Sequence, residues 1–166
     1  AGTTNVLRTL GWTPSLVTFV GDALKGVVSV LIGKWIGGTY GGYLAGIFVI
    51  LGHNWPAFYH FKGGKGIAAS FGVILALHPL VALSLLACQI IVVAITKYMS
   101  VASIVSAVVF FVMVAIYRWG DWLELVFAGI VSILAIFSHR ANIGRLIHHT
   151  ENKLDFKKIN KLSRKK

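Results

Sequence analysis

The sequence is poor in acidic residues and in charged residues of any kind. Its 166 residues include 5 Asp and Glu against 16 Lys and Arg, which gives a net charge of +11, and charged residues make up 13% of the chain. Soluble domains carry about 25% charged residues, so the composition excludes an ordinary soluble nucleic-acid-binding protein, and no nucleic-acid partner is expected. Hydrophobic residues reach 57% and the mean hydropathy is +0.79, which indicates a membrane protein.

Residue patterns for disulfides, metals and nucleophile activation are also missing. Cys88 is the single cysteine, so no intramolecular disulfide or cysteine-only metal site can form. The few acidic residues offer little to hold magnesium, and no histidine pair has zinc spacing, so neither a metal nor a cofactor is expected. None of the six histidines has a carboxylate four or five residues downstream to activate a hydroxyl group. The remaining cations, hydroxyls and amides are suited to binding anions without an evident general base.

Long apolar stretches are abundant. A helix needs about 20 apolar residues to cross a hydrocarbon core of about 30 Å. Segment 67–96 is too long for one crossing and is interrupted at His78-Pro79, which predicts a hairpin of two short halves. We expect an all-α fold, a polytopic integral membrane helical bundle of about six spans with short or broken helices around His78-Pro79. The other expected spans are 16–36, the glycine-broken 40–59, 101–117 and 123–137.

The basic residues are distributed unevenly over these spans. The hairpin topology places 14 of the 16 Lys and Arg on one side and leaves Lys34 and Arg118 on the other. The positive-inside rule then puts both ends of the chain in the cytoplasm. We expect a single membrane domain over residues 1–150 and a basic cytoplasmic tail over 151–166. The chain starts without a charged-then-apolar leader, so no signal peptide is expected.

The sharpest local motif is Phe-Lys-Gly-Gly-Lys-Gly at 61–66, directly before an apolar helix. Three glycines leave backbone N–H groups free to line a concavity, two lysines add positive charge, and a helix N-terminus favours an anion. This pattern predicts a phosphate site, and it is not a Walker A loop because no Ser or Thr follows the second lysine. The alternative is a flexible loop that contacts lipid headgroups. The candidate phosphate-binding residues are Lys62, Gly63, Gly64, Lys65 and Gly66.

Other polar residues stand inside or beside the apolar segments. Asp22 and Lys25 lie three residues apart within the first span, where a mutual pair with a structural role is favoured. His53 is favoured as a hydrogen-bonded histidine at a span boundary. His139, Asn142 and Arg145 follow the last span on one helix face. An ordinary basic flank explains the arginine but not Asn142, so structural and functional roles stay equal alternatives there.

These motifs together resemble the acyl-phosphate:glycerol-3-phosphate acyltransferase family of bacterial membranes, called PlsY, over nearly the whole chain. The resemblance is carried by Gly-Thr-Thr-Asn-Val-Leu-Arg at 2–8, Gly-His-Asn-Trp-Pro at 52–56 leading to 61–66, and Ser-His-Arg-Ala-Asn-Ile-Gly-Arg-Leu at 138–146 ending at Glu151, with shorter matches at 22–26 and 98–103.

The resemblance implies a membrane enzyme that moves a fatty acyl group from acyl phosphate to sn-glycerol 3-phosphate, giving 1-acyl-sn-glycerol 3-phosphate and phosphate. Its partners would be these two substrates and membrane lipid, and a monomer with a cytoplasm-facing site in the bacterial inner membrane is expected. The implied catalytic residues are His139, Asn142, Arg8 and Ser100. Asn5 and Arg145 join the loop residues in binding phosphate, and Asp22, Lys25, His53 and Glu151 have supporting roles.

The chain departs from the family pattern at two places. The family has seven spans, and its first motif begins with Ser-Gly-Asn just before the residues that align with Ala1 and Gly2, so the chain starts after the first family helix. His149 stands where the family usually has glycine. A non-enzymatic transporter or anionic-lipid-binding protein is the alternative function, but transporters commonly show internal repeats and none is found.

Overall fold

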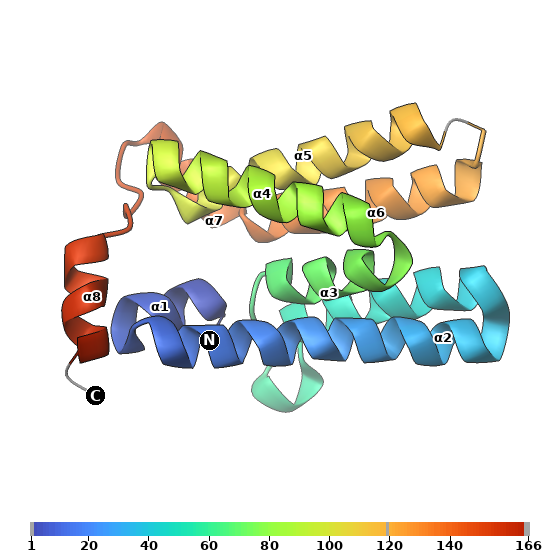
Figure 1. The fold of residues 1–166 in the computed structure, drawn as a ribbon, viewed down its shortest axis with the longest axis horizontal. Coiled ribbons are helices and arrows are strands. Elements are labelled where there is room, and N and C mark those ends of the chain that lie inside the picture. Colours follow the sequence, from blue (N-terminus) through green and yellow to red (C-terminus); the bar gives the residue numbers. More distant parts are fainter. Residues whose placement is uncertain (1, 119, 165–166) are drawn as a thin grey trace.

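The computed structural model describes residues 2–118 and 120–164, and this part of the chain is helical apart from short connections, as expected (Figure 1). The described residues contain no strand. The α-helices are α1 (Thr3–Leu10), α2 (Trp12–Asn54), α3 (Ile67–Leu77), α4 (Pro79–Thr96), α5 (Met99–Tyr117), α6 (Trp122–Ser138), α7 (Arg140–Ile147) and α8 (Phe156–Arg164), and a 3-10 turn (η1) covers Ala57–Tyr59.

Helix α2 consists of two arms that fold back on each other. Gly37 and Gly38 have non-helical backbone angles, and the φ of +59° at Gly38 is one that glycine adopts at little cost. The arms then run side by side (Figure 1). A Cβ atom at Gly33 would collide with the backbone of Gly41, so the close approach of the arms depends on these small residues.

The break at His78-Pro79 is confirmed. His78 ends α3 with φ −142° and ψ 79°, and Pro79 begins α4, where its missing N–H costs no helical hydrogen bond. Within the described residues, three helices (α2, α4 and α5) are long and apolar enough to cross a membrane, or four if α6 and α7, bent by 54°, form one span. Helix α3 has only 11 residues. The count of six crossings therefore stays a prediction.

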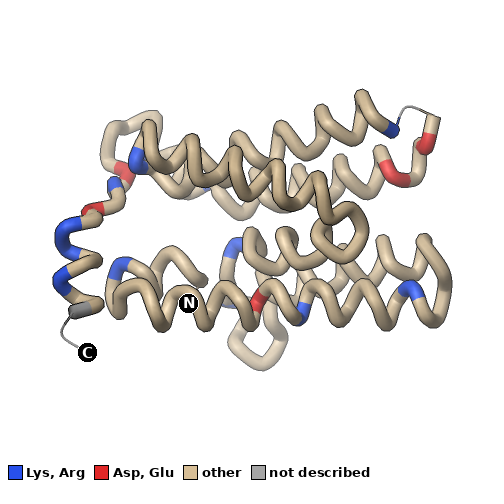
Figure 2. Tube along the Cα trace, in the orientation of Figure 1, with Lys and Arg blue, Asp and Glu red and all other residues tan. Residues whose placement is uncertain are grey.

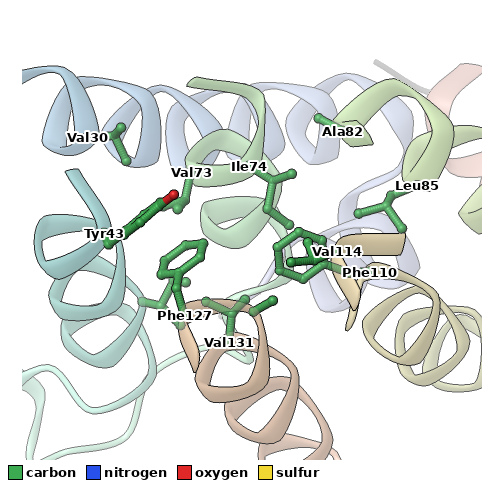
Figure 3. Close-up of a cluster of buried hydrophobic side chains, with 12 residues drawn as sticks. Val30, Tyr43, Val73, Ile74, Ala82, Leu85, Phe110, Val114, Phe127 and Val131 are labelled. Carbon is green, nitrogen blue, oxygen red and sulfur yellow. The ribbon is translucent and has the colours of Figure 1, made fainter. Parts of the chain in front are cut away.

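One apolar core joins both arms of α2 to α3, α4, α5 and α6 (Figure 3). Tyr43 stacks on Phe127 at a centroid distance of 4.8 Å, and Phe110 meets Phe127 edge-on. The outward faces of the helices also carry large apolar side chains, including Leu16, Phe48 and Ile95, which are more than 60% exposed. Such a surface is typical of a bundle that lies in lipid.

A buried carboxylate ties the helices together at one end of the bundle. Glu124 is 1% exposed and accepts hydrogen bonds from Arg118 Nε at 2.9 Å and Tyr43 OH at 3.2 Å. His78 Nε2 lies 2.9 Å from its other oxygen. An isolated charge at such depth is costly, and these partners from α2, the α3–α4 break and the end of α5 compensate for it. This cluster was not predicted.

Helix α8 runs across the other end of the bundle, beside α1 (Figure 1). Lys and Arg gather at this end, while the long middle of the helices is largely uncharged (Figure 2). Residues 151–164 of the expected tail therefore fold back onto the bundle, with Leu154 and Ile159 buried against Leu7. Residues 165–166 lie outside the described part of the chain. The site described next opens at the same end.

Candidate active site

A cavity of about 490 Å³ connects a polar mouth to an apolar interior. Its interior is walled by side chains of α3, α4, α5 and α6, among them Ile74, Leu85 and Phe110. The polar side chains at its mouth come from segments far apart in the sequence, because α1, the 63–66 loop, the start of α5 and the α6–α7 junction all lie there. The mouth contains Asn5, Arg8, Asp22, His53, Lys65, Ser100, His139, Asn142, Arg145 and Glu151.

Glu151 is the node of this polar group. Its Oε1 accepts hydrogen bonds from Asn142 Nδ2 at 2.8 Å and Ser100 Oγ at 3.1 Å, and its Oε2 accepts one from Arg145 Nε at 2.7 Å. Burial alone would raise the pKa of this carboxyl group, but the three hydrogen bonds outweigh it and hold the pKa of Glu151 below its ordinary value. The charged carboxylate therefore fixes three of the residues that were predicted to contact substrate.

Lys65 joins this group through Asn142, whose Oδ1 accepts a hydrogen bond from Lys65 Nζ at 2.6 Å. Burial lowers the pKa of Lys65, the nearby Arg145 and Arg8 lower it further, and Glu151 opposes the decrease. The amide of Asn142 is thus held at both ends, by a carboxylate and by an ammonium group. Asn142 therefore lies within the polar cluster rather than on a solvated flank.

His139 lies between α6 and α7 and is 2% exposed. Its Nδ1 lies 2.8 Å from the carbonyl oxygen of Ala135 and donates to it, because a carbonyl oxygen can only accept. Burial lowers the pKa of His139 to about 4. The imidazole is therefore neutral near pH 7, with Nε2 as an acceptor.

The glycine loop follows the expected course but uses its N–H groups differently. The N–H groups of Gly63 and Gly64 donate to the carbonyl oxygens of Asn54 and His53, each at 3.1 Å. The prediction that these two N–H groups are free to bind phosphate is therefore wrong. The glycines serve instead to bring the loop against the end of α2, where a side chain would not fit.

This packing gives a prediction for stability. Gly63→Ala should destabilise the protein by about 1–3 kcal/mol, because the added Cβ would lie 2.6 Å from Pro56 Cδ and 2.7 Å from Asn54 O, and backbone atoms cannot move away cheaply. The matched control is Gly52→Ala in α2, where no neighbouring atom lies within 4 Å of the added Cβ. Thermal unfolding in detergent would measure both, and equal midpoints would contradict the assigned packing.

The structure brings most of the predicted site residues together, with two exceptions. Lys62 and Lys25 do not line the cavity. Lys25 forms the expected pair with Asp22, with Nζ and Oδ1 2.6 Å apart, and His53 Nδ1 lies 3.3 Å from the same oxygen. Gly66, at φ +76°, turns the chain into α3.

Arg8 approaches the mouth from α1. Its Nη2 donates to the carbonyl oxygen of Asn152 at 2.8 Å, and its buried Nε has no hydrogen-bond partner among the described residues. His149, in place of the expected glycine, keeps the turn before Glu151 with a φ of +55°. A left-handed backbone at this position explains why glycine is suited to it.

Sequence reasoning missed several polar residues of the site. Asn54 donates to Ser138 Oγ at 2.9 Å and so joins the end of α2 to the end of α6. Deeper in the cavity, Gln89 bridges Ser103 and Ser106, at 3.3 and 3.1 Å. Gln89 could have been suspected from its place in an apolar helix, since polar side chains in spans need partners.

The bundle and its cavity define a class of protein, an integral membrane protein whose cavity joins cationic and amide groups to an apolar chamber. A sequence model of the family described as "Glycerol-3-phosphate acyltransferase" matches residues 1–149, and the chain belongs to this family. The expected family resemblance is thereby confirmed.

Relatives and solved structures agree with this assignment. The glycerol-3-phosphate acyltransferase of Thermoanaerobacter sp. (strain X514) is 49% identical over 93% of this chain and 77% of its own length. The glycerol-3-phosphate acyltransferase of Clostridioides difficile (strain 630) is 46% identical over 95% of this chain and 79% of its own length. Crystal structures of PlsY (YgiH), an integral membrane glycerol 3-phosphate acyltransferase, are similar in fold. The glycerol 3-phosphate form has TM-score 0.86 and 33% identity over 93% of this chain and 78% of that one. The lysophosphatidic acid form has TM-score 0.88 and 32% identity over 95% and 81%.

Proposed function

We propose that this protein transfers a fatty acyl group from acyl phosphate to sn-glycerol 3-phosphate, producing 1-acyl-sn-glycerol 3-phosphate and inorganic phosphate. The observation that carries the proposal is a cavity in which cations and amides at the mouth continue into an apolar interior. Both proposed substrates carry phosphate and the donor carries an acyl chain. The names of the relatives and the two forms of PlsY support the acceptor and the product.

Catalysis would depend on placing two anions side by side rather than on a strong nucleophile, because an acyl phosphate is already an activated mixed anhydride. Arg8, Lys65 and Arg145 would offset the charge of the two phosphates, and Ser100 and Asn142 would orient them. The acceptor hydroxyl attacks the acyl carbon, its proton passes to a phosphate oxygen of a substrate, and the carbon–oxygen bond to the leaving phosphate breaks.

The defining experiment mixes purified protein with glycerol 3-phosphate and an acyl phosphate and measures lysophosphatidic acid and released phosphate. Parallel reactions with acyl coenzyme A test the donor. Product from the thioester but not from acyl phosphate would overturn the proposed donor, and no product from either, with folded protein, would favour the non-enzymatic alternative.

We also propose that the protein lies in the bacterial inner membrane with this mouth on the cytoplasmic side, which the gathering of basic residues at that end supports. A cysteine placed at the exposed Lys157 should not react with an impermeant reagent outside intact cells. Reaction from outside would reverse the orientation.

The proposed transfer of the proton to a substrate phosphate, without His139 as the base, predicts a specific pH dependence. Because its pKa is lowered to about 4, His139 is neutral throughout pH 5–8 and too weak a base to be suited to proton abstraction. The acid limb of kcat/KM should instead follow the second ionisation of the substrate phosphate, with a pKa of about 6. The phosphonate analogue of glycerol 3-phosphate, which ionises at higher pH, should move this limb upward.

His139→Asn is the variant that tests this assignment, because its amide nitrogen matches the position of Nδ1 and can still donate to Ala135 O. The variant should keep the acid limb of the pH profile. Its kcat/KM should fall by less than about 10²-fold, which is the smallest loss expected when a general base is removed. An acid limb that disappears in this variant would identify His139 as the base.

A further inference from the structure

The C-terminal strap, defined here as residues 151–164, lies beyond the residues 1–149 matched by the family model. It nevertheless begins inside the site, because its first residue is Glu151. The strap then leaves the mouth, passes the start of α5, and ends as α8 against α1 and the beginning of α2 (Figure 1). Its path therefore connects α1, the beginning of α2 and the start of α5, and α1 and α5 supply Arg8 and Ser100 to the cavity.

Apolar contacts dock the strap. Leu154 and Ile159 are 4% and 2% exposed, and they form a small cluster with Leu7 of α1. Met99, from the start of α5, packs against the same cluster. Two of these contacts adjoin predicted substrate ligands in the sequence, since Leu7 precedes Arg8 and Met99 precedes Ser100. This cluster lies at the aqueous end of the bundle, where burial of apolar surface is favourable.

Hydrogen bonds fix the strap in register. The N–H of Leu154 donates to Lys97 O at 2.8 Å, and the indole Nε1 of Trp12 donates to Asn160 Oδ1 at 2.9 Å. The backbone N–H of Trp12, at the start of α2, donates to Ser163 Oγ at 3.0 Å, so the strap also caps this helix.

The strap reaches the substrate ligands themselves at two points. The carbonyl oxygen of Asn152 accepts the hydrogen bond from Arg8 Nη2 at 2.8 Å, and Glu151 accepts those from Ser100, Asn142 and Arg145. Movement of the strap would release both Arg8 and the Glu151 node. Arg8 would then lose its hydrogen bond to Asn152, and its Nε has no other partner among the described residues to hold the guanidinium in place.

We propose that the strap positions the phosphate-binding groups, and that Leu154 and Ile159 are positioning residues for glycerol 3-phosphate although neither lines the cavity. This rests on the proposed function. Coupling between strap docking and ligand binding must be reciprocal. If glycerol 3-phosphate binds only when the strap is docked, then the ligand must in turn stabilise the docked strap.

Hydrogen exchange of the full chain in detergent micelles measures this coupling. At a glycerol 3-phosphate concentration about 100 times its Kd, complete coupling slows exchange of the strap amides by roughly 100-fold. In the free protein, Ile159→Ala should speed their exchange roughly thirtyfold, the equivalent of the loss of about 2 kcal/mol of packing. Ile159→Val should recover most of this difference. The matched control is Lys158→Ala, an exposed neighbour in α8.

Kinetics separates positioning from mere folding. Ile159→Ala, folded by its thermal transition, should raise the KM for glycerol 3-phosphate by the factor 1/f, where f is the docked fraction of the strap that exchange measures. The KM for the acyl donor should change less, and Lys158→Ala should resemble the wild type. Binding of glycerol 3-phosphate with less than about twofold protection of the strap would overturn the proposal while leaving the proposed function intact. A folded wild-type protein that does not bind glycerol 3-phosphate would overturn both.

Discussion

Glu151→Gln should lower kcat/KM for glycerol 3-phosphate by about 10²-fold or more, the equivalent of about 3 kcal/mol. The carboxylate accepts three hydrogen bonds, two of them on one oxygen. Glutamine has nearly the same shape but offers one oxygen and one NH2 group, so at least one donor among Ser100, Asn142 and Arg145 must face another donor. The residues proposed to contact substrate would then lose their common anchor.

A matched substitution four residues away separates this effect from a general loss of negative charge. Asp155→Asn makes the same chemical change at an exposed position, where the side chain accepts from the N–H of Lys158 at 3.0 Å. Asn caps a helix about as well as Asp, so this variant should keep wild-type kinetics. Equal losses in the two variants would show that the Glu151 node has no special role. The kinetics should be compared at pH 7.5, where the lowered pKa of Glu151 keeps this carboxyl group ionised in the wild type.

The main helices could be predicted from the sequence because each apolar stretch is bounded by a strong signal. Pro79 marks the break between α3 and α4, and glycines mark the reversal within α2. The number of crossings could not be predicted in the same way. The 11 residues of α3 form an apolar helix, but apolarity alone does not say whether a short helix crosses the membrane.

The site was predicted by residue type but not by arrangement. Motifs identified Arg8, Lys65, His139 and Asn142, and the cavity contains all four. Which groups bind substrate and which bind one another depends on tertiary contacts. Glu151 lies nine residues from Asn142 and 51 from Ser100, and no local pattern predicts that one carboxylate holds both.

Two other features depend on contacts between distant segments. The N–H groups of Gly63 and Gly64 were expected to be free because glycine allows it, but the end of α2 supplies carbonyl oxygens for them. Glu124 was not singled out within the expected span 123–137. Its partners Tyr43 and Arg118 come from other helices, and buried charges are paired across elements that a linear pattern does not connect.

The two lysines of the glycine loop were equivalent in the sequence, and the structure separates them. Both are exposed, but Lys65 lines the cavity and donates to Asn142 Oδ1, whereas Lys62 lies outside the cavity lining. A cation at the mouth can donate a charge-assisted hydrogen bond to a substrate phosphate. Such a bond is about twice as strong as a neutral one. Lys62 can contribute only through its long-range field, which salt screens over about 10 Å at 0.1 M ionic strength.

Lys65→Met should therefore lower kcat/KM for glycerol 3-phosphate roughly 10²-fold, and Lys62→Met should change it less than about twofold. Methionine keeps the length and the apolar stem of lysine in both variants, so the comparison isolates the ammonium group. Asn142 should stay in place in Lys65→Met because Glu151 still accepts from its Nδ2. The residual activity of Lys65→Met should be less sensitive to salt than that of the wild type. Comparable losses in the two variants, or a larger loss in Lys62→Met, would mean that substrate phosphate binds outside this cavity, on the exposed side of the loop.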